Sequence, residues 1–414
     1  MGIFILHKKE MALITHQLED RRLLLLSPNY TDFVKDPSEA IAKHVKKMTI
    51  MIRYNVLVEL LRYIPLGGIF DSIRAWNTKE KLLDLQGKPE NIDIHLLSML
   101  YYVRDGKNKS LGDKIAKKAE KLIKKEGIKF DLIHAHFTYP YGYAAVKLGQ
   151  KYNVPVVITI HENRDSFLEE YKSGNKRIYW TWKNADALIR VNQKDVPLLK
   201  EYNENVFYVP NGFNPRTFFA MERSKAREIL KLPKDRRIIF TLSALIERKG
   251  FQYLIDSMNE IVKVRKDVLC FIGGSGPMRR KFEAQIRNLG LQDYIKLIGY
   301  VPDDRITYWL NAADLFVLPS LSEGNPTVMF EALGVGLPFI GTRVGGIPEI
   351  ITSEDYGLLC ESANPKDLAD KILIALEKEW DREKILEYAK QFTWERVANE
   401  TVGIYNDLFN SGID

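Results

Sequence analysis

The chain alternates short apolar runs with longer segments that carry apolar residues at helical spacing. The runs contain few polar positions, a pattern typical of parallel strands that are buried on both faces. They occupy residues 21–26, 131–137, 156–160, 185–191, 206–209, 237–242, 268–274, 294–299, 315–318, 339–341 and 357–360. Helices are expected between them, for example over 113–125, 278–288 and 365–377. The alternation predicts an α/β fold with doubly wound parallel sheets.

Length and one group of turn residues divide the chain into two domains. A chain of 414 residues exceeds an ordinary single core. Turn residues at 210–214 follow the apolar run at 206–209. We therefore expect one Rossmann-like domain over 1–215 and a second over 216–391, facing each other across a cleft between the carboxyl ends of their strands.

The stretch 315–341 has the order strand, loop, helix, strand. Its loop, 320–325, opens at the carboxyl end of an apolar run and leads to Pro326. Proline at a first helical position and Asn325 as a preceding cap predict a helix that starts here and ends near Val335. In doubly wound sheets ligands bind at such an edge, where free N–H groups at a helix amino terminus favour an anion.

Two carboxylates frame this loop. Glu323 lies within it, and Glu331 follows after seven further residues, inside the expected helix. A carboxylate in an apolar crevice is costly unless hydroxyl groups or a cation meet it. Two carboxylates around an anion-binding helix end suit a nucleotide sugar, which has hydroxyl groups on both sides of a phosphate. The alternative is one acid that complements the helix dipole and one solvated helical acid.

Other polar residues follow apolar runs at the same kind of edge. His134 and His136 close one run, and His161 follows another. Parallel strands bring such residues to one edge of a sheet, although a histidine there can also be purely structural. Lys249 follows the run at 237–242 and could meet two phosphates as a point charge, or it could be an exposed lysine beside a helix.

The composition of the chain indicates which classes of binding partner and which cellular compartment to expect. The net charge of +7 favours anionic partners such as nucleotide phosphates or anionic lipid, and nucleic acid is not expected. The two cysteines, Cys270 and Cys360, lie in apolar runs and are interpreted as buried hydrophobic residues in a reducing compartment. No zinc-ligand spacing, signal-peptide pattern or apolar run of ~18 residues is visible. A cytoplasmic protein is therefore expected, with peripheral contact at the inner membrane face as a further hypothesis.

Two segments bear on that membrane hypothesis. The expected helix at 113–125 has lysines on its exposed face, which could meet anionic lipid or simply be solvated. Residues 48–76 mix basic, aromatic and apolar positions, so they could form a membrane-surface segment. The alternative for 48–76 is a strand followed by an excursion that packs on its own domain.

The stretch from Pro319 to Ile350 resembles the donor-site signature of the family 4 retaining glycosyltransferases, which have the GT-B fold. The matching positions are Ser320, Glu323, Gly324, Pro326, Glu331, Ala332, Gly336, Pro338, Gly345, Gly346, Pro348 and Glu349. The resemblance covers about residues 21–410 and is most specific over 237–350. It implies that the final segment, 392–414, crosses back onto the first domain, with Trp394 as a packing anchor between the domains.

The resemblance and the positions in the loop suggest roles in the second domain. Glu331 is expected to hold ribose hydroxyls, and Glu323 the sugar and phosphate. The backbone of the loop is expected to join Glu323 in that role, at Gly324, Asn325, Pro326 and Thr327. Lys249 is expected to stabilise the departing phosphate together with the helix dipole. Glu323, His161 and Lys249 are therefore the candidate catalytic residues.

Further roles come only from the resemblance. It implies that His161 meets the transferred sugar from the first domain, and that the turn at Gly299 and Tyr300 borders the nucleotide base. The family has an arginine five residues before its lysine, where this chain has Ala244, so one phosphate contact is either missing or supplied by Arg248.

The chain departs from the family pattern at two further places. No Gly-Gly pair occurs in the first expected strand-to-helix loop, 27–38, so no phosphate role is assigned there. After His161 the family has a small residue and an aspartate, whereas this chain has Glu162 and Asn163. That second departure bears on the acceptor side of the site.

The expected function is transfer of a sugar from a nucleotide diphosphate sugar, with retention, to a glycan or lipid-linked acceptor, as in polysaccharide biosynthesis. The donor is expected to be a UDP-, GDP- or ADP-sugar, with no cofactor and no metal. Two alternatives remain: a GT-B nucleotide-sugar epimerase, and a non-catalytic glycan-binding protein.

Overall fold

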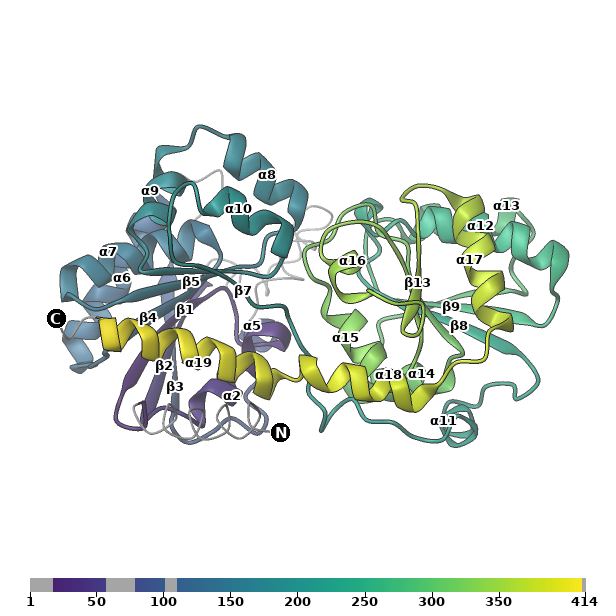
Figure 1. The fold of residues 1–414 in the computed structure, drawn as a ribbon, viewed down its shortest axis with the longest axis horizontal. Coiled ribbons are helices and arrows are strands. Elements are labelled where there is room, and N and C mark those ends of the chain that lie inside the picture. Colours follow the sequence, from purple (N-terminus) through teal and green to yellow (C-terminus); the bar gives the residue numbers. More distant parts are fainter. Residues whose placement is uncertain (1–17, 57–78, 101–109, 412–414) are drawn as a thin grey trace, which may run out of the picture. The chain divides into compact units, whose positions relative to one another are not determined.

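The computed structural model of the chain describes residues 18–56, 79–100 and 110–411 (Figure 1). The chain divides into two compact units. Unit 1 contains the described residues up to Glu162, Ser166–Pro210 and those from Trp394 onward. Unit 2 contains Asn163–Asp165 and Asn211–Thr393. The main division therefore falls between Pro210 and Asn211, slightly before the position near 215 expected from the sequence.

Unit 1 is built on a seven-stranded parallel sheet of order β3-β2-β1-β4-β5-β6-β7. Its strands are β1 (Arg22–Ser27), β2 (Lys47–Asn55), β3 (Ile92–Met99), β4 (Leu132–His136), β5 (Val156–Ile160), β6 (Ala187–Arg190) and β7 (Val206–Tyr208). Its helices are α2 (Asp32–Ala42), α5 (Lys79–Leu82), α6 (Leu111–Glu126), α7 (Tyr143–Tyr152), α8 (Arg164–Lys172), α9 (Lys176–Asn184), α10 (Val196–Leu199) and α19 (Trp394–Ser411).

The sheet of unit 1 has helices on both faces. Leu24 and Leu26 of β1 belong to one buried cluster, together with residues of α6 and α7. Leu23 and Leu25 belong to a second cluster, with residues of α2 and α19. Since successive strand residues point to opposite faces, the all-apolar sequence of β1 serves both layers. The last helix, α19, packs beside α2 (Figure 1), and its Trp394 is buried in the second cluster.

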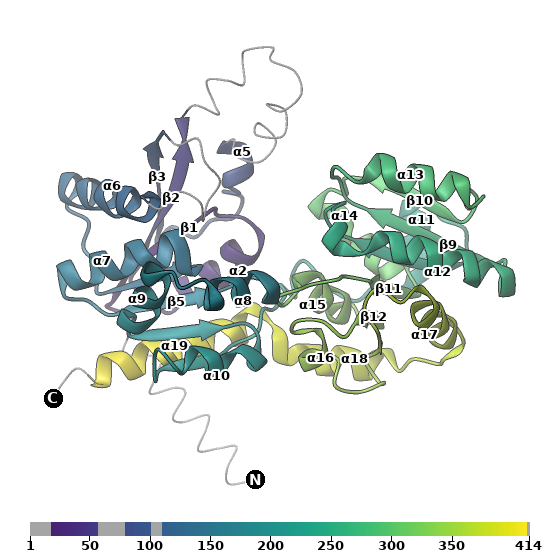
Figure 2. The ribbon, with the colours of Figure 1, turned by 90° about the horizontal axis from the view of Figure 1, so that it is seen from above.

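Unit 2 is built on a six-stranded parallel sheet of order β10-β9-β8-β11-β12-β13 (Figure 2). Its strands are β8 (Arg237–Leu242), β9 (Val268–Gly273), β10 (Ile295–Gly299), β11 (Leu315–Leu318), β12 (Phe339–Thr342) and β13 (Gly357–Cys360). Its helices are α11 (Arg223–Leu230), α12 (Phe251–Val264), α13 (Arg279–Asn288), α14 (Asp303–Ala312), α15 (Thr327–Gly334), α16 (Ile347–Ile350), α17 (Pro365–Glu377) and α18 (Arg382–Ala389). One buried cluster joins the sheet to α12, α13 and α17, and another joins it to α14, α15 and α18.

Most strands and helices follow the sequence pattern, but β3 was not among the predicted strands, and other positions differ as well. The first loop was expected over 27–38, but α2 already begins at Asp32 and contains Pro37. The helix after the central loop begins at Thr327, so Pro326 is its N-cap residue. Asn325 does not cap that helix, because its side chain accepts a hydrogen bond from the backbone N–H of Asn211. Of the segment 48–76, β2 covers the start, and residues 57–78 lie outside the described part of the chain.

Candidate functional site

The loop at 319–326 of unit 2 joins β11 to α15 at the carboxyl edge of the sheet. β11 lies between β8 and β12, so the loop is flanked by the segments that follow both of these strands. Gly250 and Gly345 pack against it with positive φ angles of 69° and 54°. A Cβ atom would lie 1.9 Å from the Pro319 carbonyl oxygen at Gly250, and 2.1 Å from the Glu323 carbonyl oxygen at Gly345. Only glycine fits such close backbone approaches, which fix the course of the loop.

Glu323 is buried in this loop and is paired with two cations. Its Oε1 accepts hydrogen bonds from Lys249 Nζ and from Ser320 Oγ, each at 2.6 Å. Its Oε2 lies 3.4 Å from Arg248 Nη1. A buried carboxylate needs such partners, because an uncompensated charge in the interior is strongly destabilising. The structure therefore brings together three residues that the sequence singled out separately: Glu323, Lys249 and Arg248.

Arg248 also holds the loop through its backbone and side chain. It lies in a short 3-10 helix, η3 (Glu247–Lys249), that follows β8. Its Nη1 donates to the Ser322 carbonyl at 2.6 Å, and its own carbonyl accepts from the Leu321 N–H at 2.8 Å. The guanidinium is about one-third exposed, so part of it can still meet a ligand.

Asn325 faces the start of unit 2 instead of capping α15. Its Oδ1 accepts the backbone N–H of Asn211 at 2.8 Å, and its carbonyl accepts Asn211 Nδ2 at 2.6 Å. Both residues are buried. The sequence had suggested only a turn at Asn211, and the link to Asn325 could not be foreseen because 114 residues separate the two.

The remaining predicted residues of unit 2 lie in several environments. Gly324 and Pro326 are buried in the loop, whereas Thr327 and Glu331 of α15 are partly exposed. Gly299 ends β10 with a φ of 76°. Tyr300, which follows it, is 68% exposed.

The predicted histidines of unit 1 form a hydrogen-bonded cluster at the ends of β4 and β5. His136 Nδ1 and His161 Nε2 are 2.8 Å apart, and the two rings are stacked. His134 is bonded at both ring nitrogens, to Thr159 Oγ1 at 2.8 Å and to the Tyr405 hydroxyl at 2.6 Å. Because both nitrogens are satisfied and the ring is buried, His134 has a structural role.

Burial keeps these rings neutral. It lowers the pKa of His136 to about 4. The pKa of His161 also lies well below its usual value, mainly through burial and further through His136. A neutral pair holds one proton in the hydrogen bond between the two rings. Among the described residues, His161 Nδ1 has no hydrogen-bond partner.

Sequence reasoning missed a buried charged group beside His161. Arg190 is fully buried and bonds Asp195 through Nη2 at 2.7 Å. It also donates to the Glu162 carbonyl at 2.9 Å. Burial raises the pKa of the Glu162 carboxyl, and it raises the pKa of Glu170 to about 9, with a further contribution from Glu162. In the sequence these positions are simply charged residues, which are equally typical of an exposed surface, so their burial could not be predicted.

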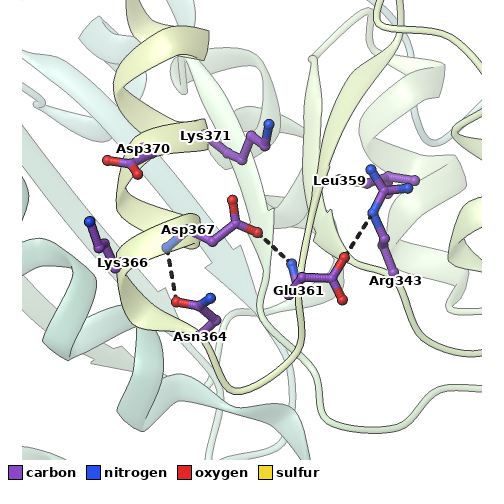
Figure 3. Close-up of a pocket in the computed structure, with 8 residues that line it drawn as sticks. All are labelled: Arg343, Leu359, Glu361, Asn364, Lys366, Asp367, Asp370 and Lys371. Atoms are coloured by element: carbon purple, nitrogen blue, oxygen red, sulfur yellow. Dashed lines mark hydrogen bonds and ion pairs between the residues drawn. The ribbon is translucent and has the colours of Figure 1, made fainter.

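A hollow of about 450 Å³ lies elsewhere in unit 2, between the segments after β12 and β13 and the start of α17 (Figure 3). Some of the residues that line it are bonded to one another. Arg343 pairs with Glu361 at 3.2 Å, and the Glu361 N–H donates to Asp367 Oδ2 at 2.7 Å. None of the predicted site residues lines it, so the hollow does not mark the predicted site.

The described part of the chain contains neither a cluster suited to a metal ion nor a helix that could span a membrane. Residues 18–56, 79–100 and 110–411 contain no group of three or more histidine, cysteine or acidic side chains placed to hold a metal ion. Within these same ranges no helix is both long and apolar enough to span a bilayer.

Comparisons with known proteins agree with this architecture. Residues 222–392 match the family described as "Glycosyl transferases group 1", and residues 86–217 match "Glycosyltransferase Family 4". A glycosyltransferase of Methanocaldococcus jannaschii, itself uncharacterized, is 28% identical over 374 residues, covering 86% of this chain and 99% of the relative.

Solved structures show the same fold. Sucrose-phosphate synthase from Thermosynechococcus elongatus superimposes with a TM-score of 0.76 at 21% identity, over 95% of this chain and all of that one. HepE from Anabaena, in complex with UDP, has a TM-score of 0.68 at 17% identity, with 95% and 100% covered. The chain thus has the GT-B fold, and the two family matches, over residues 86–217 and 222–392, identify it as a glycosyltransferase of family 4.

Proposed function

We propose that unit 2 binds a nucleotide diphosphate sugar and that the enzyme transfers its sugar, with retention, to a glycan or lipid-linked acceptor. The observation that carries the proposal is the pairing of the buried Glu323, in the loop that precedes α15, with Lys249 and Arg248 of η3. It places two cations and a helix amino terminus, all suited to a diphosphate, beside a carboxylate suited to hydroxyl groups. Solved structures of HepE with UDP and with UDP-glucose support this class of donor.

The chemistry follows from charge. When the bond between the sugar and the diphosphate breaks, negative charge grows on the departing phosphate. Lys249, Arg248 and the N–H groups at the start of α15 are positive groups held in place before the reaction, so they stabilise that charge with little rearrangement. Glu323 and Glu331 accept hydrogen bonds from hydroxyl groups of the donor. No metal ion is required in this proposal.

The donor is tested by thermal stabilisation. The protein is heated alone and with UDP-glucose, GDP-mannose or ADP-glucose, because a ligand that binds only the folded state raises Tm. We expect one of the three nucleotides to raise Tm by several degrees, and Lys249→Ala to abolish most of that rise. Release of free nucleotide only when an acceptor is present distinguishes a transferase from an epimerase, which needs no acceptor.

For a lipid-linked acceptor, we propose that unit 1 contacts an anionic membrane through α6. This helix carries three acidic residues and six exposed lysines. The lysines are Lys114, Lys117, Lys118, Lys121, Lys124 and Lys125. Lysines near an anionic surface contribute about 1 kcal/mol each. Sedimentation with anionic and with neutral vesicles tests the contact. Binding only to the anionic vesicles, weakened by salt and by Lys117→Glu with Lys121→Glu, is expected; equal binding to both kinds contradicts it.

A further inference from the structure

The Asn325 side chain has one satisfied end and one unsatisfied end. Its Oδ1 accepts the Asn211 N–H at 2.8 Å. Among the residues that the structure describes, Asn325 Nδ2 has no hydrogen-bond partner, although Asn325 is only 5% exposed. Buried polar groups are nearly always hydrogen-bonded, so this NH2 group needs an acceptor, which a water molecule or an oxygen of a bound ligand would supply.

The orientation of this amide follows from its neighbour. The oxygen and nitrogen of an asparagine side chain are exchanged by a simple flip. Here a flip would point the NH2 group at the Asn211 N–H, so two donors would face each other and a hydrogen bond would be lost. Asn211 therefore fixes Oδ1 on its own side and leaves the NH2 group on the opposite side of the amide.

Another buried asparagine of unit 2 shows the ordinary arrangement. Asn311 Oδ1 also accepts a backbone N–H, that of Met221, at 2.8 Å. Its Nδ2, however, donates to the Phe219 and Thr307 carbonyls at 3.0 and 2.9 Å. The two asparagines therefore differ in whether the side-chain NH2 group donates hydrogen bonds within the described part of the protein: that of Asn311 does, and that of Asn325 does not.

The place of Asn325 in the chain indicates what its NH2 group would meet. Asn325 lies two residues after Glu323 and immediately before Pro326, the N-cap of α15. Proline has no N–H, so the helix start lacks one donor at this position. A side-chain NH2 group beside it supplies a donor suited to an oxygen of a ligand bound at the helix end.

We propose that Asn325 is a binding residue whose side-chain NH2 group donates to an oxygen of the sugar nucleotide, in an orientation fixed by Asn211. The inference rests on the proposed binding of a nucleotide sugar in unit 2. The accepting oxygen belongs either to the diphosphate or to a sugar hydroxyl, and both are hydrogen-bond acceptors.

The test compares two variants of Asn325 with a matched control. Asn325→Asp keeps an oxygen for the Asn211 N–H but removes the NH2 group. Asn325→Ala removes the NH2 group without adding charge. Asn311→Asp makes the same chemical change at the fully bonded asparagine. Affinity is measured by calorimetry for three pairs of ligands: UDP and UDP-glucose, GDP and GDP-mannose, and ADP and ADP-glucose. Wild-type protein is measured first, to identify the preferred pair. Ligand-free Tm shows that each variant is folded.

We expect both Asn325 variants to bind the preferred sugar nucleotide at least tenfold more weakly, while Asn311→Asp stays within about twofold of wild type. If the nucleoside diphosphate and the sugar nucleotide lose affinity equally, Asn325 Nδ2 donates to a phosphate oxygen. If only the sugar nucleotide loses affinity, Nδ2 donates to a sugar hydroxyl. The inference is overturned if Asn325→Ala is folded and binds the sugar nucleotide as tightly as wild type. Weaker binding by Asn325→Asp alone would then reflect only repulsion between its carboxylate and the diphosphate. If wild-type protein binds no member of the panel, the proposed function fails as well.

Discussion

Lys249 Nζ lies 2.6 Å from Glu323 Oε1, and the two side chains are only 12% and 5% exposed. The pair joins the segment after β8 to the loop after β11. A diphosphate that binds here meets a lysine already compensated by a carboxylate, so donor binding has to share or replace this ion pair. Glu323 thus serves first to hold the cation in place and then, in our proposal, to bind the sugar.

Substitutions of Lys249 and Glu323 should have strongly non-additive effects on the free energy of unfolding. Lys249→Met removes the cation and leaves the buried Glu323 carboxylate with Ser320 and Arg248 only. Breaking one side of a buried pair costs about 3 kcal/mol or more, whereas removing both sides costs less. We therefore expect Lys249→Met with Glu323→Gln to be more stable than Lys249→Met alone. Urea unfolding of the two single variants and the double variant measures the coupling, and additive effects would contradict it.

Glu331 should matter for nucleotide affinity and little for folding. It lies on α15 and is partly exposed, so it can meet hydroxyl groups of a ligand. Loss of a hydrogen bond to a charged group in a desolvated site costs on the order of 2 kcal/mol. Glu331→Ala should therefore weaken nucleotide binding at least tenfold by calorimetry. The control is Glu260→Ala, on an exposed part of α12; an equal loss in both variants would assign the effect to overall charge.

The histidine cluster should make unit 1 sensitive to acid. Burial lowers the pKa of His136 to about 4, below the ordinary value of 6.5. Between these two pH values the unfolded chain binds a proton that the folded protein does not, so stability is lost as pH falls from 6.5 towards 4. The loss from one such histidine is about 3 kcal/mol at most. Tm measured from pH 7.5 to 4.5 should fall less steeply in His136→Asn than in wild type; parallel curves would contradict this account.

Glu170 should have the opposite pH dependence. Its pKa is raised to about 9, so the folded protein holds a proton that the unfolded chain loses above about pH 4.5. Stability is therefore lost as pH rises through this window. Glu170→Gln, which needs no proton, should be more stable than wild type at pH 8, on the order of 3 kcal/mol, with the difference shrinking towards pH 5. A difference that does not change with pH would show that the carboxyl is ionised in the folded protein.

The sequence predicted the layers and the loop because both depend on local patterns. All-apolar runs such as 315–318 can only be buried strands in a doubly wound sheet, and that run is β11. A glutamate in a loop that leads into a helix was likewise visible, and the structure places Glu323 there.

Other features depend on residues that are far apart in the chain. Nothing local indicates that Asn325 turns from the helix to Asn211, or that Tyr405 of the last helix bonds His134. The buried group around Arg190 was missed for the same reason, since burial of a charge is decided by the packing of whole elements. Local capping rules also favoured Asn325 as the cap, but a pair of tertiary hydrogen bonds competes with that role.

The most direct test of the central claim is hydrogen exchange with and without the sugar nucleotide that stabilises the protein best. Binding at the loop before α15 should slow exchange in peptides that cover residues 319–331 and 245–250, and Lys249→Ala should remove that protection at the same ligand concentration. Tight binding that leaves these two segments unprotected while protecting another part of the chain would contradict the account.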